Sequence, residues 1–197
     1  MGINVKTISL SITSFALSVL ISSTALSAQV DIVYEGPSNS TALTTKDGKG
    51  SKAVEGTVYA GLSSITVDGT NSLAVNTSNS SMEGTWEATV NDYAAVQDGA
   101  GEYNSGPNGE EKYAKAGYLF SLLDLSESLS ETAAKYNALV NYVIWDIMGD
   151  VPNLKNKNDK DEAKDLKKSA DKNKKFDWST TMVVYTGAEG KNQREFF

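Results

Sequence analysis

The chain of 197 residues contains no cysteine and no histidine. Without cysteine it can form no disulfide bond and offers no thiolate nucleophile, and without histidine it offers no imidazole base. Together these absences exclude the Ser-His-Asp triad and the usual structural zinc sites. We therefore expect no catalytic, cofactor-binding or metal-binding residues, and a fold that burial and hydrogen bonds alone hold together.

The chain also lacks an apolar run long enough for a membrane anchor, which needs about 18 consecutive apolar residues. Its most apolar segment, residues 8–21, is interrupted by five serine and threonine residues. Lys6 precedes this segment and the small residues 22–28 follow it, the arrangement of a secretory signal peptide. We predict a signal peptide over residues 1–27, and hence a secreted, extracellular or cell-envelope protein with no stable membrane span after cleavage.

Cleavage after residue 27 leaves 170 residues, a length that suits one domain, residues 28–197. The removed segment carries one lysine and no acid, so the formal charge of −7 becomes −8. An acidic balance of this size favours solubility and predicts no general affinity for nucleic acid.

The first half of the domain has the patterns of β-strands. Apolar and polar residues alternate over 30–34 and 85–90. Residues 57–67 are rich in β-branched side chains and end at the turn dipeptide 68–69, after which residues 72–75 resume a strand pattern. We predict a β-hairpin there, and exposed loops over the Ser-, Thr-, Asn- and Gly-rich residues 36–56 and 76–84.

The middle of the chain predicts two helices. Apolar residues recur at helical spacing over 112–123, and a capping-box pattern at Ser128 and Glu131 opens a second helix that ends at Gly149. Residues 142–148 are apolar on almost every side, so this part should lie at the centre of the core.

A late strand is expected over residues 181–186, covered on both faces because its apolar side chains point both ways. Early strands, two central helices and a returning strand indicate the α+β class. We expect an antiparallel sheet or sandwich packed with the two-helix segment.

Residues 155–175 form a lysine-rich insert, with nine lysines against five acids. This excess of four positive charges in an acidic protein could serve an anionic partner, such as a surface polysaccharide or another anionic polymer. A solvated helix or loop whose mixed charges only maintain solubility is the alternative.

Glycoside hydrolysis needs only two carboxylates, so paired acids are also considered. Asp146 and Asp150 lie four residues apart near a helix end, beside Trp145, which could stack on a sugar. The alternative is that the acids form the solvated rim of a core helix and that Trp145 lies in the core.

Four segments, 84–88 with its Trp86, 113–119, 141–148 and 193–197, occur in an order that resembles exported bacterial PEP-CTERM-type surface proteins. The domains of that family resemble the thioester domains of bacterial adhesins, and the resemblance covers residues 59–197. In thioester domains a cysteine of the strand region bonds to a glutamine four residues before the tryptophan. Asn141 occupies that position here and the cysteine is absent, so the resemblance implies a degenerate domain with no internal thioester. The resemblance implies a sorting tail after residues 193–197, which this sequence does not contain, so we expect either a tail that has been lost or truncated or a protein that is released.

Two hypotheses follow. The preferred one is an exported, non-catalytic cell-surface or extracellular-matrix protein with a structural, binding or adhesive role. The alternative is an exported carbohydrate-active hydrolase that uses paired carboxylates.

Overall fold

The computed structural model describes residues 28–47, 54–77, 84–106, 108–126, 128–149, 151–187 and 195–197. The predicted signal peptide, residues 1–27, lies outside the described residues. The strands are β1 (Ala28–Asp47), β2 (Val54–Val67), β3 (Thr70–Ala74), β4 (Thr85–Asn91), β5 (Asn153–Leu154), β6 (Val184–Gly187) and β7 (Glu195–Phe196). The helices are α1 (Tyr93–Gln97), α2 (Gly109–Phe120), α3 (Glu131–Met148), α4 (Lys157–Lys172) and the 3₁₀-helix η2 (Glu102–Ser105).

The strands form one antiparallel sheet in the order β3-β2-β1-β4-β6-β7, with β5 paired to β1. The two ends of this order also meet. The backbone N–H groups of Val75 and Phe197 each donate to the other residue's carbonyl at 3.0 Å, and the N–H of Thr77 donates to the carbonyl of Glu195 at 3.1 Å. Because Val75 and Thr77 follow β3 directly, β7 joins one edge of the sheet to the other.

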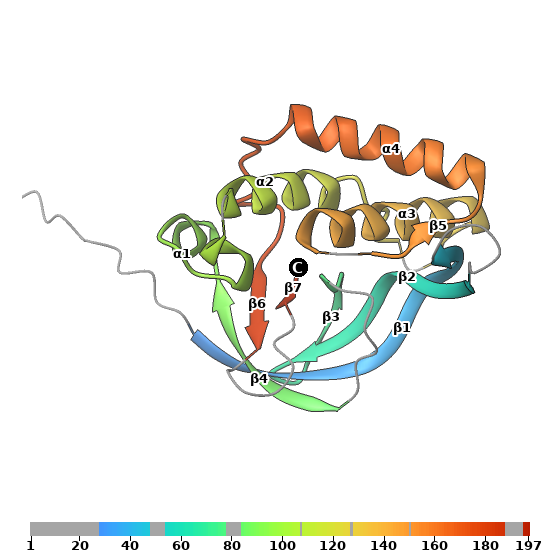
Figure 1. Cartoon of the computed structure of the whole chain (residues 1–197). Helices are drawn as coiled ribbons and strands as arrows, with labels where there is room; N and C mark the ends of the chain where they lie inside the picture. Colours follow the sequence, from blue (N-terminus) through green and yellow to red (C-terminus); the bar gives the residue numbers. More distant parts are fainter. Residues whose placement is uncertain are drawn as a thin grey trace, which may run out of the picture.

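The helices cover one side of this curved sheet in two layers (Figure 1). α2 and α3 lie next to the sheet, and α4 lies over them as the outermost element. The α+β class predicted from the sequence is confirmed, with α2 and α3 as its central two-helix segment.

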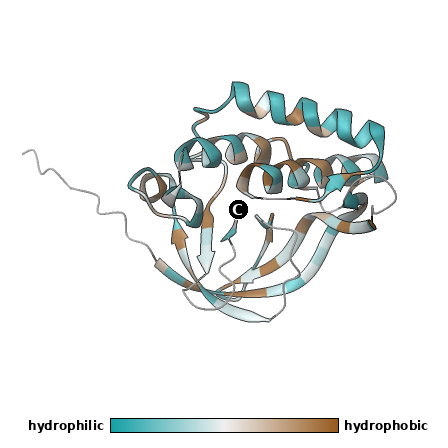
Figure 2. Ribbon diagram, viewed as in Figure 1, coloured by the Kyte–Doolittle hydropathy of each residue, from teal (hydrophilic) through white to brown (hydrophobic). Residues whose placement is uncertain are grey.

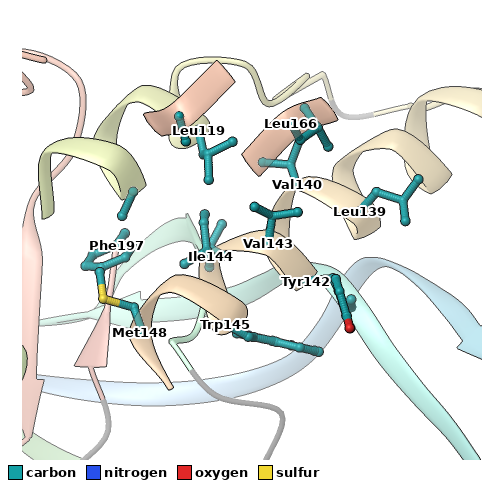
Figure 3. Close-up of a cluster of buried hydrophobic side chains, with 14 of the residues drawn as sticks. Leu119, Leu139, Val140, Tyr142, Val143, Ile144, Trp145, Met148, Leu166 and Phe197 are labelled. Atoms are coloured by element: carbon teal, nitrogen blue, oxygen red, sulfur yellow. The ribbon is translucent and has the colours of Figure 1, made fainter. Parts of the chain in front are cut away.

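The main core lies around α3, as the all-round apolar segment predicts. The side chains of Val140, Val143 and Ile144 are at most 1% exposed. Figure 3 shows them between Leu119 of α2, Leu166 of α4 and Phe197 at the C-terminus, so this core joins all the layers.

A second, smaller core lies on the opposite face of the sheet. Successive side chains of a strand point to opposite faces, and in β3 Leu73 packs against the main core while Ala74 belongs to the smaller cluster. The buried members of that cluster are Ile32, Ile65, Ala74 and Ala88. Half-buried side chains, including Tyr34, Trp86 and Tyr185, pack around it.

The expectation of an exposed loop is wrong for residues 36–47 and 54–56, and residues 48–53 lie outside the described residues. β1 continues through Asp47, paired with β2, which begins at Val54. Two register shifts, close to Gly36 and Asn39, break the alternation by which a strand is recognised from sequence. Threonines supply the β-branched side chains of this part. Backbone pairing, more than buried apolar area, therefore forms the second half of β1.

The exposed loop predicted over residues 76–84 is wrong at its start. Thr77 is 3% exposed and Asn76 is half-buried, because both bond to elements on other parts of the chain. Residues 78–83 lie outside the described residues.

The helix bounds differ from the predicted ones by two or three residues. α2 begins at Gly109 and ends at Phe120, because Asn108 in the left-handed conformation (φ 65°) starts it early. The N-cap of α3 is Ser130, whose hydroxyl accepts from the N–H of Ala133 at 3.2 Å. The capping box opened by Ser128 is therefore wrong, since Glu131 directly follows the N-cap and is the first residue of the helix, not the third.

The returning strand also begins later than predicted. Residues 178–182 form a turn in which the N–H of Thr181 donates to the carbonyl of Trp178 at 2.9 Å, so β6 starts only at Val184. Met182 and Val184 are buried, as expected for one face. Val183, which precedes β6, is 38% exposed, whereas in β6 itself Val184 packs in the main core and Tyr185 packs half-buried against the smaller core. The expected cover on both faces therefore holds for β6 but not for the residue before it.

Candidate functional site

The aromatic residue beside the carboxylate pair is buried. Trp145 is 1% exposed, and its indole N–H donates to the carbonyl of Asn76 at 2.8 Å. Asp146 is partly exposed and accepts from the ammonium group of Lys167 at 2.5 Å. Asp150 lies outside the described residues. Trp145 therefore belongs to the core, and its ring offers no open face to a sugar.

Asn141 joins three elements through its buried side-chain amide. Its carbonyl oxygen accepts from the N–H of Gly61 in β2 at 3.0 Å, and its NH₂ donates to the carbonyl of Asn76 at 3.1 Å. Gly61 is required at this contact, because its φ of 128° strains other residues and a Cβ there would lie 2.4 Å from the carbonyl oxygen of Asn39. At this position, then, an amide forms a noncovalent link between α3 and β2.

Glu195 is the most deeply buried carboxylate among the described residues, with 0% of the residue exposed. The hydroxyl of Tyr113 lies 2.8 and 2.7 Å from its two oxygens and donates to them. The hydroxyl of Thr186 and the N–H of Glu102 also donate, at 2.8 and 3.0 Å. Burial raises the pKa of Glu195 to about 7, although these hydrogen bonds act to lower it.

The surroundings of Glu195 leave no room for a substrate. A Cβ on Gly101 would lie 2.3 Å from the Tyr113 hydroxyl oxygen, so η2 closes against the carboxylate. Protein donors bind both carboxylate oxygens, and Glu195 sits where β7 joins the segment after β3. We assign it a structural role in holding the C-terminal strand. Sequence analysis missed it, because a single glutamate beside two phenylalanines has no periodic signal.

The lysine-rich insert is a helix, α4, over most of its length. Asp159, Ala163, Leu166 and Ala170 are buried and form its inner face. On the outer face five exposed lysines follow one another at steps of three or four residues, which forms a row about 22 Å long. We call this row the lysine stripe: Lys157, Lys160, Lys164, Lys168 and Lys172. Figure 2 shows α4 as hydrophilic along most of its length.

Most of the lysine stripe is not neutralised by carboxylates. Among the described residues, only Lys168 of the stripe forms an ion pair, with Asp165 at 2.9 Å. Asp161 and Asp171 are also exposed on this side, Asp171 being paired with Lys115 at 2.7 Å, and they reduce the excess charge without cancelling it. The stripe is therefore a stiff row of cations available to an external anion.

Two hollows adjoin α4. A cleft of about 600 Å³ lies between the start of α3 and the start of α4, where Lys135 forms an ion pair with Asp159 at 2.7 Å. A pocket of about 370 Å³ lies where α1, α2 and the segment after α4 meet. Tyr93 and Gln97 of α1 line this second pocket, and sequence analysis missed them because a five-residue helix shows no periodicity.

Within the part of the chain that the structure describes, no helix combines the length and apolar character that crossing a membrane requires. Comparisons of the chain with protein-family models, with curated proteins and with solved structures each give no match.

Proposed function

We propose that the protein is an exported, non-catalytic component of the cell surface or extracellular matrix that binds an acidic polysaccharide through the lysine stripe. The observation that carries the proposal is the row of exposed lysines on α4. A linear polymer with regularly spaced carboxylates can follow such a row and contact several lysines at once.

The charge of the rest of the chain supports this use of α4. The whole chain carries −7, although residues 155–175 carry an excess of four positive charges. A polyanion is therefore repelled by most of the protein and attracted at α4, which orients the bound polymer along one helix. The position of α4 as the outermost layer leaves this face accessible (Figure 1).

The resemblance to degenerate thioester domains is consistent with noncovalent binding. The chain has no cysteine, so it cannot capture a ligand through a thioester. The amide of Asn141, at the position that the resemblance assigns to the reactive glutamine, is occupied by hydrogen bonds to Gly61 and Asn76.

The binding proposal is tested by titrating the protein with a polyuronate and with neutral dextran. Wild type should bind only the polyuronate, and more weakly as salt is raised, because exposed charges are screened over about 8–10 Å. Each exposed ion pair contributes about 0.2–1 kcal/mol, so the double variant Lys160→Gln/Lys164→Gln should bind about 2- to 30-fold more weakly. The control double variant Lys46→Gln/Lys155→Gln removes the same charge from exposed positions outside the stripe. Equal weakening by both variants would refute a role specific to α4.

Export and the absence of catalysis have their own tests. Intact-mass measurement of the protein from culture medium, envelope and cytoplasm should find a species shortened by about 27 residues outside the cytoplasm. Incubation with polysaccharides should release no fragments. Glycan cleavage that Asp146→Asn abolishes would instead establish the hydrolase alternative.

A further inference from the structure

We propose that the 370 Å³ pocket between α1, α2 and the segment after α4 seats one uronic acid residue of the polymer that the lysine stripe binds. This inference rests on the proposed binding of an acidic polysaccharide, and it names the place where a single sugar ring is recognised. Elsewhere along the stripe, the polymer contacts only the charged ends of the lysine side chains.

The pocket has aromatic walls of the kind that suit a sugar ring. Tyr93 and Phe176 are both half-buried and both line the pocket. Tyr93 is held by an edge contact with Trp178, with ring centroids 5.2 Å apart, and Phe176 by one with Tyr118 at 5.8 Å. Rings fixed in this way contact the C–H face of a pyranose with little loss of side-chain entropy.

The polar groups of the pocket match a ligand that has one acid and several hydroxyl groups. Lys175 is exposed and forms no ion pair with the described carboxylates, so it can bind the ligand's carboxylate. Gln97, Glu110 and Glu111 provide oxygen atoms that accept from hydroxyl groups. Lys174 is already shared with Glu111, at 3.7 Å.

The same groups disfavour a phosphate-rich polymer. Such a polymer has a high density of negative charge and few hydroxyl donors, so the carboxylates of Glu110 and Glu111 would repel it. A polyuronate carries one charge per ring and keeps hydroxyl groups that these carboxylates can accept from.

The pocket also continues the lysine stripe. Lys172 is the last lysine of the stripe and Lys175 follows three residues later, at the pocket. A polymer that runs along α4 therefore reaches the pocket without leaving the row of cations. Lys157, at the other end of the stripe, lies about 22 Å from Lys172 along the helix, so a disaccharide cannot reach both.

The test uses a uronic acid disaccharide, a neutral disaccharide of the same ring type and a polyphosphate of equal charge to a polyuronate. Wild type should bind the acidic disaccharide, shift the ring-proton NMR signals of Tyr93 and Phe176, and show at least fivefold weaker binding of the neutral one. Gln97→Ala changes no charge and should weaken disaccharide binding about 3- to 10-fold, with polyphosphate binding unchanged. Lys175→Gln should weaken it similarly. The matched charge change Lys46→Gln, at an exposed lysine of β1 outside the stripe, should leave it within twofold of wild type.

The outcomes separate the two proposals. If wild type binds no polyuronate, the proposed function fails and this inference fails with it. If polyuronate binds and Lys160→Gln/Lys164→Gln weakens it, but Gln97→Ala and Lys175→Gln change disaccharide binding no more than Lys46→Gln does, the inference alone is refuted. Equal affinity for the neutral disaccharide would also refute it, because the acid group would then contribute nothing.

Discussion

Replacing Glu195 by glutamine should remove a large part of the pH dependence of folding stability. Burial raises the pKa of this carboxyl from 4.5 to about 7, so the folded state keeps its proton where the unfolded chain has lost it. The two values differ by about 2.5, and one unit corresponds to about 1.4 kcal/mol, so the effect is about 3 kcal/mol.

The direction follows from proton linkage. Between pH 4.5 and about 7 the folded state binds more protons than the unfolded state, so the free energy of unfolding falls as pH rises and levels off above pH 7. Burial raises the pKa of Glu102, which adds to this fall. Hydrogen bonds from Lys168 and Ser179 lower the pKa of Asp165 and Asp177, whose contribution is instead lost as pH drops below about 4. Asp165 and Asp177 therefore hardly affect the free energy of unfolding between pH 5 and 7.

Urea unfolding followed by tryptophan fluorescence between pH 4.5 and 8.5 measures the effect. Wild type should lose about 3 kcal/mol of unfolding free energy across the window, and Glu195→Gln should lose much less. Glu87→Gln removes an exposed carboxyl of β4 as a control and should keep the wild-type slope. A Glu195→Gln profile parallel to wild type would show that Glu195 keeps an ordinary pKa, and the reasoning from burial would be wrong.

Three further substitutions test the packing. Tyr113→Phe removes a donor that lowers the pKa of Glu195, so urea unfolding should show a loss of about 0.5–1.5 kcal/mol at pH 5 and a larger one at pH 8; an equal loss at both pH values would contradict this. Gly117→Ala, normally favourable in a helix by about 1 kcal/mol, should lower Tm because its Cβ would lie 2.4 Å from that of Trp178; a higher Tm would refute the clash. Trp145→Phe should cost about 1 kcal/mol more than Trp178→Phe in calorimetry, since the indole N–H of Trp145 has an acceptor and that of Trp178 has none among the described residues; equal costs would contradict it.

The sequence predicts those helices and strands in which apolar residues recur at a regular spacing and are buried either on one side or on every side. The apolar residues of 142–148 identify the core of α3 because every side of that segment is buried, so no neighbour in sequence conceals the pattern. The lysine-rich insert is predicted to be an outer, solvated element for a different reason, because its many charges disfavour burial in the core.

The sequence does not predict the structure where backbone pairing or contacts between distant residues determine it. Gly36 and the register shift beside Asn39 conceal the second half of β1, although it pairs with β2 as far as Asp47. Thr77 is buried because distant residues bond to it: its hydroxyl donates to the carbonyl of Glu195, 118 residues later, and accepts from the Tyr103 hydroxyl. The pocket joins α1, α2 and the segment after α4, and none of them predicts it alone.

The ion pair of Lys135 and Asp159 connects α3 to the start of α4, and it should contribute to holding the lysine stripe in place. Its ammonium and carboxylate groups are 2.7 Å apart, with the Asp159 side chain 7% exposed and that of Lys135 44% exposed. Lys135→Met leaves a buried carboxylate without its cation. Complete burial would make that loss about 3–5 kcal/mol, and the exposure of Lys135 reduces it to about 1–3 kcal/mol.

A double-mutant cycle separates the pair from its surroundings. Asp159→Asn should also destabilise the protein, in part because a carboxylate in the first turn of α4 is favoured by the helix dipole. If the pair interacts as its geometry indicates, Lys135→Met/Asp159→Asn should be more stable than the sum of the single losses implies, by about 0.5–2 kcal/mol in urea unfolding. Additive losses would mean that solvent replaces the lysine at no cost and that this pair does not help to hold α4 against α3.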